Sequence, residues 1–288
     1  METPELSKRV VNALENHGYK GKFVSIERIH DLESELARHR KDGSLDGHLY
    51  DLYLDRFAFN RANDAFKAQS VIIATAPQPQ LQMTFQWQGS SYPGILPPTY
   101  DCAPDQLIAD VLVSILKPEG YHLEKIRLPQ KVLAVRSGLA RYGKNNITYV
   151  PGLGSFHRPV AFISDLPCPQ DGWQKYQIMD DCRDCDACRR ACPTGAISPD
   201  RFLLYAERCI TFHNELPGEF PEWLNPSWHH CLVGCMICQK ACPANRDIRK
   251  WITEGAVFSE EETSDILQST LQSKLPPDTI KKLDQLDM

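Results

Sequence analysis

The cysteines carry the clearest chemistry in this chain. Ten of the eleven lie between Cys168 and Cys242, and only Cys102 stands apart. One run has the spacing C-x2-C-x2-C-x3-C-P and is formed by Cys182, Cys185, Cys188 and Cys192. In bacterial ferredoxins with this spacing, the first three thiolates bind one 4Fe-4S cluster and the fourth binds another. The run therefore predicts two clusters, electron transfer and a second cysteine motif.

The second motif is C-x2-C-x3-C-P and is formed by Cys235, Cys238 and Cys242. It lacks one ligand, because a ferredoxin repeat would have a cysteine at position 232, which here is Leu232. Either Cys209 or Cys231 can supply that thiolate, and spacing alone leaves both open. We expect two clusters, one on Cys182, Cys185, Cys188 and Cys242, and the other on Cys192, Cys235, Cys238 and one of these two.

Two other cofactors fit parts of the pattern. Structural zinc would use the CxxC pairs, with His229, His230 and Cys231 as further ligands, but it needs neither Cys-Pro ending. The spacing from Cys231 to Cys238 also matches the radical S-adenosylmethionine motif, although it overlaps the ferredoxin repeat and no barrel sequence follows. We expect Cys102 and Cys168 to be ordinary thiols.

Composition narrows the class of protein. The 288 residues are 42% hydrophobic and 24% charged, with a formal net charge of −5, which predicts a globular chain of about two domains rather than a disordered or polybasic one. The longest apolar stretches, 71–76 and 107–116, are too short to span a membrane. Residues 1–10 show no export signal, so we expect a cytoplasmic protein, in which disulfides are rare.

The elements that must position the cysteines follow from periodicity. Residues 1–168 alternate helices and strands, which predicts an α/β (α+β) layered domain. The helices are expected at 4–17, 31–41, 107–116 and from Pro129; the strands are expected at 23–26, 71–76, 81–87, 123–128 and 160–163. The stretch 49–59 stays ambiguous, and 92–98 is expected to be a loop. A two-cluster domain at 169–250 and a short helical tail at 251–288 follow. In the tail, Ser259 and Glu262 predict a capping box for a helix through Leu271.

A glycine-rich loop follows the helix that begins at Pro129. The stretch from Arg136 to Arg158 contains cations and amides among its glycines, which suits an anionic or amide-rich ligand. A capped helix followed by a solvated turn would have the same composition. On its own, this motif does not decide between the two.

An ordered series of landmarks resembles epoxyqueuosine reductase over about residues 125–245. The landmarks are Arg136-x-Gly-Leu-x-x-Tyr-Gly-Lys-Asn-Asn146, Gly154-Ser155, Ser164-Asp-Leu-Pro167, the first cysteine run ending Cys192-Pro-Thr-Gly-Ala-Ile197, Arg208-Cys-Ile210 and Gly234-Cys-x2-Cys-x3-Cys-Pro243. That family and its relatives, the reductive dehalogenases, join a nitroreductase-like cobalamin-binding domain to a bacterial-ferredoxin-like two-cluster domain. The resemblance implies the same architecture here.

The resemblance also assigns residues. It implies that Cys209 completes the second cluster and that Cys231 is left free. It implies that a corrinoid borders Arg141, Tyr142, Gly143, Lys144, Asn145, Asn146, Gly154 and Ser155. A low-potential electron donor such as ferredoxin or flavodoxin is expected as a partner.

The sequence departs from that family at two points. The family's catalytic Asp stands in a Val-Asp-Thr segment, whereas the ungapped match here is Glu124. We therefore expect Glu124 or Tyr142 to donate the proton. The tail is short and has more acids than bases, and because phosphates are bound by cations, we expect tRNA not to be a partner.

Two functions follow. The first is a cobalamin-dependent reductase, in which the clusters pass single electrons to a cobalamin that reduces a small organic substrate. The alternative is a non-catalytic electron-transfer or activator protein that reduces a partner, such as a corrinoid protein.

Overall fold

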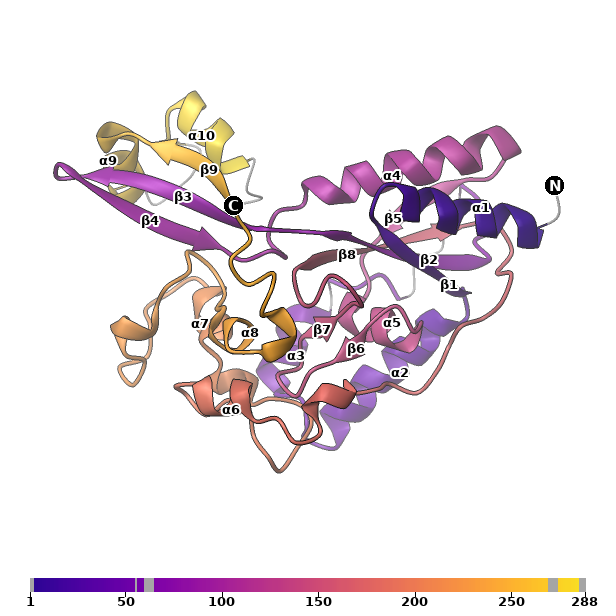
Figure 1. Ribbon diagram of the computed structural model, residues 1–288, viewed down its shortest axis with the longest axis horizontal. Helices are drawn as coiled ribbons and strands as arrows, with labels where there is room; N and C mark the ends of the chain where they lie inside the picture. Colours follow the sequence, from indigo (N-terminus) through magenta and orange to yellow (C-terminus); the bar gives the residue numbers. More distant parts are fainter. Residues whose placement is uncertain (1–2, 55, 60–64, 269–273, 285–288) are drawn as a thin grey trace.

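The computed structural model describes residues 3–54, 56–59, 65–268 and 274–284 (Figure 1). Its helices are α1 (Thr3–Asn16), α2 (Arg28–Lys41), α3 (Gly47–Leu54), α4 (Ala103–Leu116), α5 (Gln130–Arg136), α6 (Ala187–Ala191), α7 (Ile210–Asn214), α8 (Ile237–Lys240), α9 (Glu260–Gln268) and α10 (Pro277–Asp284). Its strands are β1 (Lys20–Ser25), β2 (Ser70–Pro77), β3 (Gln80–Trp87), β4 (Ser90–Leu96), β5 (Leu123–Ile126), β6 (Arg141–Tyr142), β7 (Thr148–Tyr149), β8 (His157–Ser164) and β9 (Ile252–Phe258). Short 3-10 helices are η1 (Lys117–Glu119), η2 (Asp180–Cys182), η3 (Ala206–Arg208), η4 (Pro226–Trp228) and η5 (Pro243–Asn245).

A four-stranded sheet forms the centre of the N-terminal part. Its strands run in the order β1-β2-β8-β5, and every neighbouring pair is antiparallel. Apolar residues fill both faces of β2, so the strand is buried along almost its whole length. Both faces must therefore be covered by helices.

The two faces of the sheet pack against different helices. Ile72 and Phe162 face α1 and α4, whereas Val71 and Ile163 face α2 and α5. Neighbouring residues of a strand point to opposite sides, so a single apolar run serves both layers. The result is a three-layer α/β arrangement, which confirms the mixed α/β class; the nitroreductase-like label stays a prediction.

The expected helices and strands of the first 168 residues are present, with ends shifted by a few residues. The expected loop at 92–98 is wrong, because β4 runs through Pro93 and Gly94 and pairs with β3. Since β4 is an edge strand, a proline costs it no hydrogen bond inside the sheet. The ambiguous stretch 49–59 begins within α3.

The tail is not only helical, as expected, because it begins with β9. This strand pairs in parallel with β3 and completes a second sheet of order β4-β3-β9. The capping box is confirmed: the backbone N–H of Ser259 donates to Glu262 Oε2 at 2.8 Å, and that of Glu262 donates to Ser259 Oγ at 3.2 Å. The expected helix end at Leu271 lies outside the described residues.

The cysteine-rich segment lies between β8 and β9 and consists of short helices and turns around α6, α7 and α8 (Figure 1). Buried apolar residues in it include Ile197, Ile210, Leu224 and Met236. Within the described ranges, no helix is long and apolar enough to cross a membrane.

Candidate iron-sulfur site and adjoining cavity

Two groups of cysteines form in the segment after β8. Cys188 interacts electrostatically with Cys182, Cys185 and Cys242. Cys235 interacts with Cys192, Cys209 and Cys231, and Cys238 with Cys209 and Cys235. All eleven cysteines are free thiols. Cys188 and Cys238 are also neighbours, so the two groups lie next to each other, and Cys231 is a further neighbour of the second. The assignment of four thiols to each cluster stays a prediction.

Burial disfavours the charged form of these thiols in the absence of iron. It raises the pKa of Cys188 to about 11 and that of Cys235 to about 12, and it also raises the pKa of Cys209. A bound metal reverses this effect, because a coordinating thiol is deprotonated outright. Buried, closely grouped thiols of this kind suit a metal cluster better than free thiolates.

A tight hairpin of the N-terminal part reaches into the cysteine segment. β6 and β7 pair through Arg141 with Tyr149 and Tyr142 with Thr148. The turn between them contains Asn146, whose φ of 56° lies in the left-handed region. Asparagine tolerates this conformation better than most residues. Asn146 also fixes the turn to the cysteine segment, because its Nδ2 donates to the carbonyl of Phe202 at 2.7 Å and its Oδ1 accepts from the N–H of Leu204.

The hairpin lies beside thiols of both groups. The backbone N–H of Lys144 is a neighbour of Cys182. The Asn145 side chain lies beside Cys238, and the Tyr149 hydroxyl lies beside Cys242. Burial raises the pKa of Tyr149 far above its ordinary value, and the neighbouring Cys242 raises it further.

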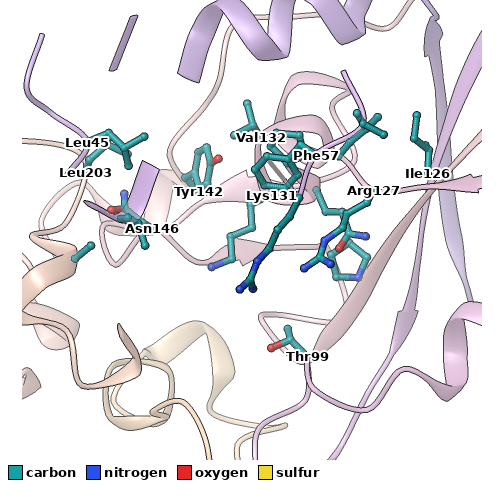
Figure 2. Close-up of a pocket in the computed structure, with 18 of the residues that line it drawn as sticks. Leu45, Phe57, Thr99, Ile126, Arg127, Lys131, Val132, Tyr142, Asn146 and Leu203 are labelled. Atoms are coloured by element: carbon teal, nitrogen blue, oxygen red, sulfur yellow. The ribbon is translucent and has the colours of Figure 1, made fainter. Parts of the chain in front are cut away.

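A cavity of about 1080 Å³ lies between the central sheet and the cysteine segment. Figure 2 shows Tyr142 and Asn146 on one side of it, and Arg127 and Ile126 on the other. Most of the wall comes from the chain around Leu45, the residues 56–58, the segment 125–132, the hairpin and residues 203–206, and Thr99, Asp105, Arg158 and Pro159 complete it. Ala206 is three residues before Cys209, so the cavity wall and the second cysteine group share η3.

Basic side chains dominate the charge of the cavity lining. They are Arg56, Lys125, Arg127, Lys131 and Arg158, against the acidic Asp46 and Asp105. Both carboxylate oxygens of Asp105 are ion-paired. Arg158 donates to Oδ1 at 2.9 Å and to Oδ2 at 3.0 Å, and Lys125 Nζ lies 2.6 Å from Oδ2. The remaining positive charge favours a ligand with anionic groups.

Of the eight residues that the resemblance places beside a corrinoid, Tyr142 and Asn146 line the cavity. The others face the cysteine segment or its flank. Arg141 pairs with Asp180 at 2.6 Å, and Lys144 Nζ donates to the carbonyl of Cys185 at 3.0 Å. Gly143 packs against Asn145 and Tyr149.

Gly154 and Ser155 lie against the residues that follow Cys242. A Cβ on Gly154 would stand 2.5 Å from Asn245 Oδ1, and Ser155 Oγ donates to Gln239 Oε1 at 2.8 Å. These two residues hold the two parts of the chain together, and neither is among the cavity-lining residues.

The two expected proton donors lie in different places. Burial raises the pKa of Tyr142 well above its ordinary value, and its side chain lines the cavity. Glu124 shares a sheet face with Ile126, because Glu124 and Ile126 pair with Ile163 and Ala161 of β8. It stands two residues before Ile126 in β5 and is not among the cavity-lining residues.

Sequence reasoning missed Tyr149, Arg127 and Lys131. Tyr149 contacts both Asn145 and Cys242, and the two cations line the cavity. The clustering of Lys125, Arg127 and Lys131 within seven positions was the available signal. Nothing local distinguishes Tyr149 from an ordinary core tyrosine.

Comparison with known proteins shows which family model and which curated proteins this chain resembles. The family described as "4Fe-4S double cluster binding domain" matches residues 181–245. Epoxyqueuosine reductase of Leadbetterella byssophila is 36% identical over 125 residues, which is 43% of this chain and 39% of that protein. Epoxyqueuosine reductase of Escherichia coli K12 is 36% identical over 118 residues, 41% of this chain and 30% of that protein. The matches thus span well under half the length of these two curated relatives.

Solved structures extend the likeness to the whole fold. Epoxyqueuosine reductase from Streptococcus thermophilus superposes with a TM-score of 0.62 at 18% identity, covering 97% of this chain and 75% of that one. An epoxyqueuosine reductase solved with an epoxyqueuosine-modified tRNA-Tyr stem loop gives a TM-score of 0.62 at 21% identity, covering 86% of this chain and 67% of that one.

Fold and cysteine motif together define an iron-sulfur protein, in which a double 4Fe-4S cluster domain is joined to a mixed α/β domain. Over about two fifths of its length, the chain is similar in sequence to epoxyqueuosine reductases.

The expectation that tRNA is not a partner is contradicted by the relative that was solved with a tRNA stem loop. The expectation rested on the acidic tail and the net charge of the chain. Those quantities do not describe the local field, because five basic side chains and only two acidic ones line one cavity. The charge argument therefore does not exclude a nucleic acid.

Proposed function

We propose that this protein is a reductase in which two 4Fe-4S clusters pass single electrons toward a ligand in the cavity beside the hairpin 141–149. One observation carries the proposal: the hairpin lines the cavity through Tyr142 and Asn146 and lies beside thiols of both cysteine groups. The nine residues 141–149 thus connect the cysteine groups, which would supply the electrons, with the cavity that would bind the ligand.

The cysteines fit the two clusters. The first group offers four thiols and the second offers five with Cys231, and backbone N–H groups lie beside several of them, as suits iron-sulfur centres. We assign Cys182, Cys185, Cys188 and Cys242 to one cluster, and Cys192, Cys209, Cys235 and Cys238 to the other. The clusters supply one-electron steps, and the protein sets their order through hydrogen bonding and burial.

The cavity also fits a corrin. Its volume of about 1080 Å³ reaches the upper end of the range of roughly 300–1000 Å³ that small-molecule sites occupy. Apolar residues such as Phe57, Leu128 and Val132 would pack against the macrocycle, and Asn146 would meet its polar rim. When bound, a cobalamin would supply a metal centre that accepts single electrons and acts on the substrate. The sheet domain would then be the nitroreductase-like, cobalamin-binding half that the resemblance implies.

Tyr142 is the residue that we propose to donate the proton. It lies in the cavity wall, and its phenol O–H is a hydrogen-bond donor that is protonated at neutral pH. A positioned acid near the reacting group lowers the cost of forming a charged product. Glu124 has a carboxyl group but does not line the same cavity.

We propose a tRNA-borne modified nucleoside of the epoxyqueuosine kind as the substrate. Two observations support this: the name and bound stem loop of the solved relative, and the excess of basic side chains around the cavity. Arg127 and Lys131 would contact phosphates, while the nucleoside enters the cavity.

The experiment begins with anaerobic reconstitution and measurement of iron and sulfide. The loaded protein is then titrated with cob(II)alamin while the cobalt EPR signal is followed. Stoichiometric conversion to a base-off spectrum is the expected result. Incubation with a chemical reductant and an epoxyqueuosine-modified stem loop should then yield the reduced nucleoside by mass spectrometry. Full clusters with an unchanged free-cobalamin spectrum would overturn the corrin site and leave the electron-transfer alternative.

A further inference from the structure

Two buried side chains of the hairpin connect the two cysteine groups. Asn145 is 2% exposed and Tyr149 is 4% exposed. Asn145 Nδ2 donates to the Tyr149 hydroxyl at 3.1 Å. The Asn145 side chain also lies beside Cys238, and the Tyr149 hydroxyl lies beside Cys242. Each member of this pair is thus next to a thiol and bonded to the other member.

The two thiols belong to different clusters. In the assignment above, Cys238 binds the cluster of Cys192 and Cys209, whereas Cys242 binds the cluster of Cys182 and Cys188. One buried hydrogen-bonded pair is therefore adjacent to one ligand of each cluster. The same hairpin lines the cavity through Tyr142 and Asn146.

The backbone is shaped to allow this arrangement. A Cβ on Gly143 would stand 2.5 Å from Asn145 Oδ1 and 2.7 Å from Tyr149 Cε2. Those distances are too short for any real side chain, so a residue larger than glycine would displace both members of the pair. Asn145 Oδ1 also accepts from the N–H of Ile147 at 3.3 Å, which orients the amide.

Hydrogen bonds to sulfur set the potentials of iron-sulfur clusters. A donor stabilises the more negative, reduced state of the cluster and so raises its reduction potential. On the basis of the proposed function, we infer that Asn145 and Tyr149 are positioning residues that raise the potentials of the two clusters separately, Asn145 through Cys238 and Tyr149 through Cys242. The pair thereby sets the difference between the reduction potentials of the two clusters.

The test is an EPR-monitored redox titration of anaerobically reconstituted, full-length protein. Tyr149→Phe removes one hydroxyl and keeps the ring, so the cluster of Cys242 should move to a more negative potential while the other changes little. Asn145→Ala should move chiefly the cluster of Cys238. A tenfold change in the oxidised-to-reduced ratio at fixed potential is the expected size, and it corresponds to about 59 mV for one electron.

Two further variants complete the design. Gly143→Ala should shift both clusters, because its Cβ would displace both side chains. Tyr121→Phe is the matched control, since Tyr121 packs beside α1 and α4 on the far face of the sheet. It should shift neither.

The possible results separate the two proposals. Wild-type protein that takes up no iron and sulfide would overturn the proposed function itself. Fully loaded Tyr149→Phe and Asn145→Ala with wild-type potentials would overturn the inference alone. Loss of iron from either variant, in protein that circular dichroism shows to be folded, would also overturn it, because a donor that only adjusts the potential is not needed to hold the cluster.

Discussion

Asn245 and Ser155 form two hydrogen bonds with each other across the boundary between the sheet domain and the cysteine segment. The N–H of Ser155 donates to Asn245 Oδ1 at 3.1 Å, and Asn245 Nδ2 donates to Ser155 Oγ at 2.8 Å. Asn245 is fully buried and also donates to the carbonyl of Gln239 at 2.8 Å. This small network, three residues after Cys242, fixes the end of the second cysteine motif to the loop before β8.

Substitution of Asn245 should therefore cost stability. Asn245→Ala leaves the buried N–H of Ser155 without its acceptor, for which we expect a loss of about 2 kcal/mol in the free energy of unfolding. Urea denaturation of the reconstituted protein measures it. Asn225→Ala, at an exposed cap, is the control and should change the free energy by less than half as much. Equal effects would contradict a special role for the buried network.

The ligand assignment makes a sharp prediction about iron content. Cys209→Ala should lose one cluster's iron and sulfide, whereas Cys231→Ala should keep both. The reason is that Cys209 neighbours three cysteines of its group, with η3 and α7 fixing its backbone. Iron and sulfide analysis per chain decides the matter. The reverse pattern would make Cys231 the ligand.

The proton donor can be tested with paired variants. Tyr142→Phe removes the hydroxyl from the cavity wall and should lower kcat about 100-fold while iron content stays unchanged. Glu124→Gln, outside the cavity lining, should lower kcat far less. Turnover of a modified stem loop under a chemical reductant gives both values. A larger loss in Glu124→Gln would restore that carboxyl group as the acid.

His157 predicts how stability depends on pH. Burial lowers its pKa to about 4, and its ring nitrogens lie 2.8 Å from Thr75 Oγ1 and 3.1 Å from the carbonyl of Thr148. The unfolded chain binds this proton near pH 6.5, so stability is unaffected above that pH and falls as the pH drops toward 4. The loss should reach about 3 kcal/mol.

Denaturation of wild-type protein and His157→Gln at several pH values from 7 to 4 measures this dependence. The variant should lose most of the difference between the two ends of the range. An equally steep pH dependence in both proteins would assign the effect to other groups.

The sequence predicted the parts of this structure that depend on local pattern. Alternating apolar residues gave β3, the buried run 71–76 gave β2, and cysteine spacing gave the two groups of thiols. These features depend on neighbours within a few residues, so a single sequence contains them.

Long-range contacts were out of reach. β9 pairs with β3, and the backbone N–H of Gln80 donates to the carbonyl of Trp251, which is 171 residues away in the sequence. The periodicity of a short segment contains no information about a partner so far along the chain. The direction of the hairpin side chains was equally hidden. The sequence predicted Lys144 and Asn145 to be ligand-binding residues of a loop. In the structure they face the cysteine segment, because Asn146 bonds the turn to residues 202–204.

The parallel pairing of β9 with β3 has a consequence for the order of assembly. The β3-β4 hairpin closes between neighbouring segments, whereas β9 reaches its place only after the whole cysteine segment has been compacted. Contacts of such high sequence separation form late, because the entropy of closing the intervening chain is lost before they contribute. We therefore expect the second sheet to be completed only after the cysteine segment has become compact.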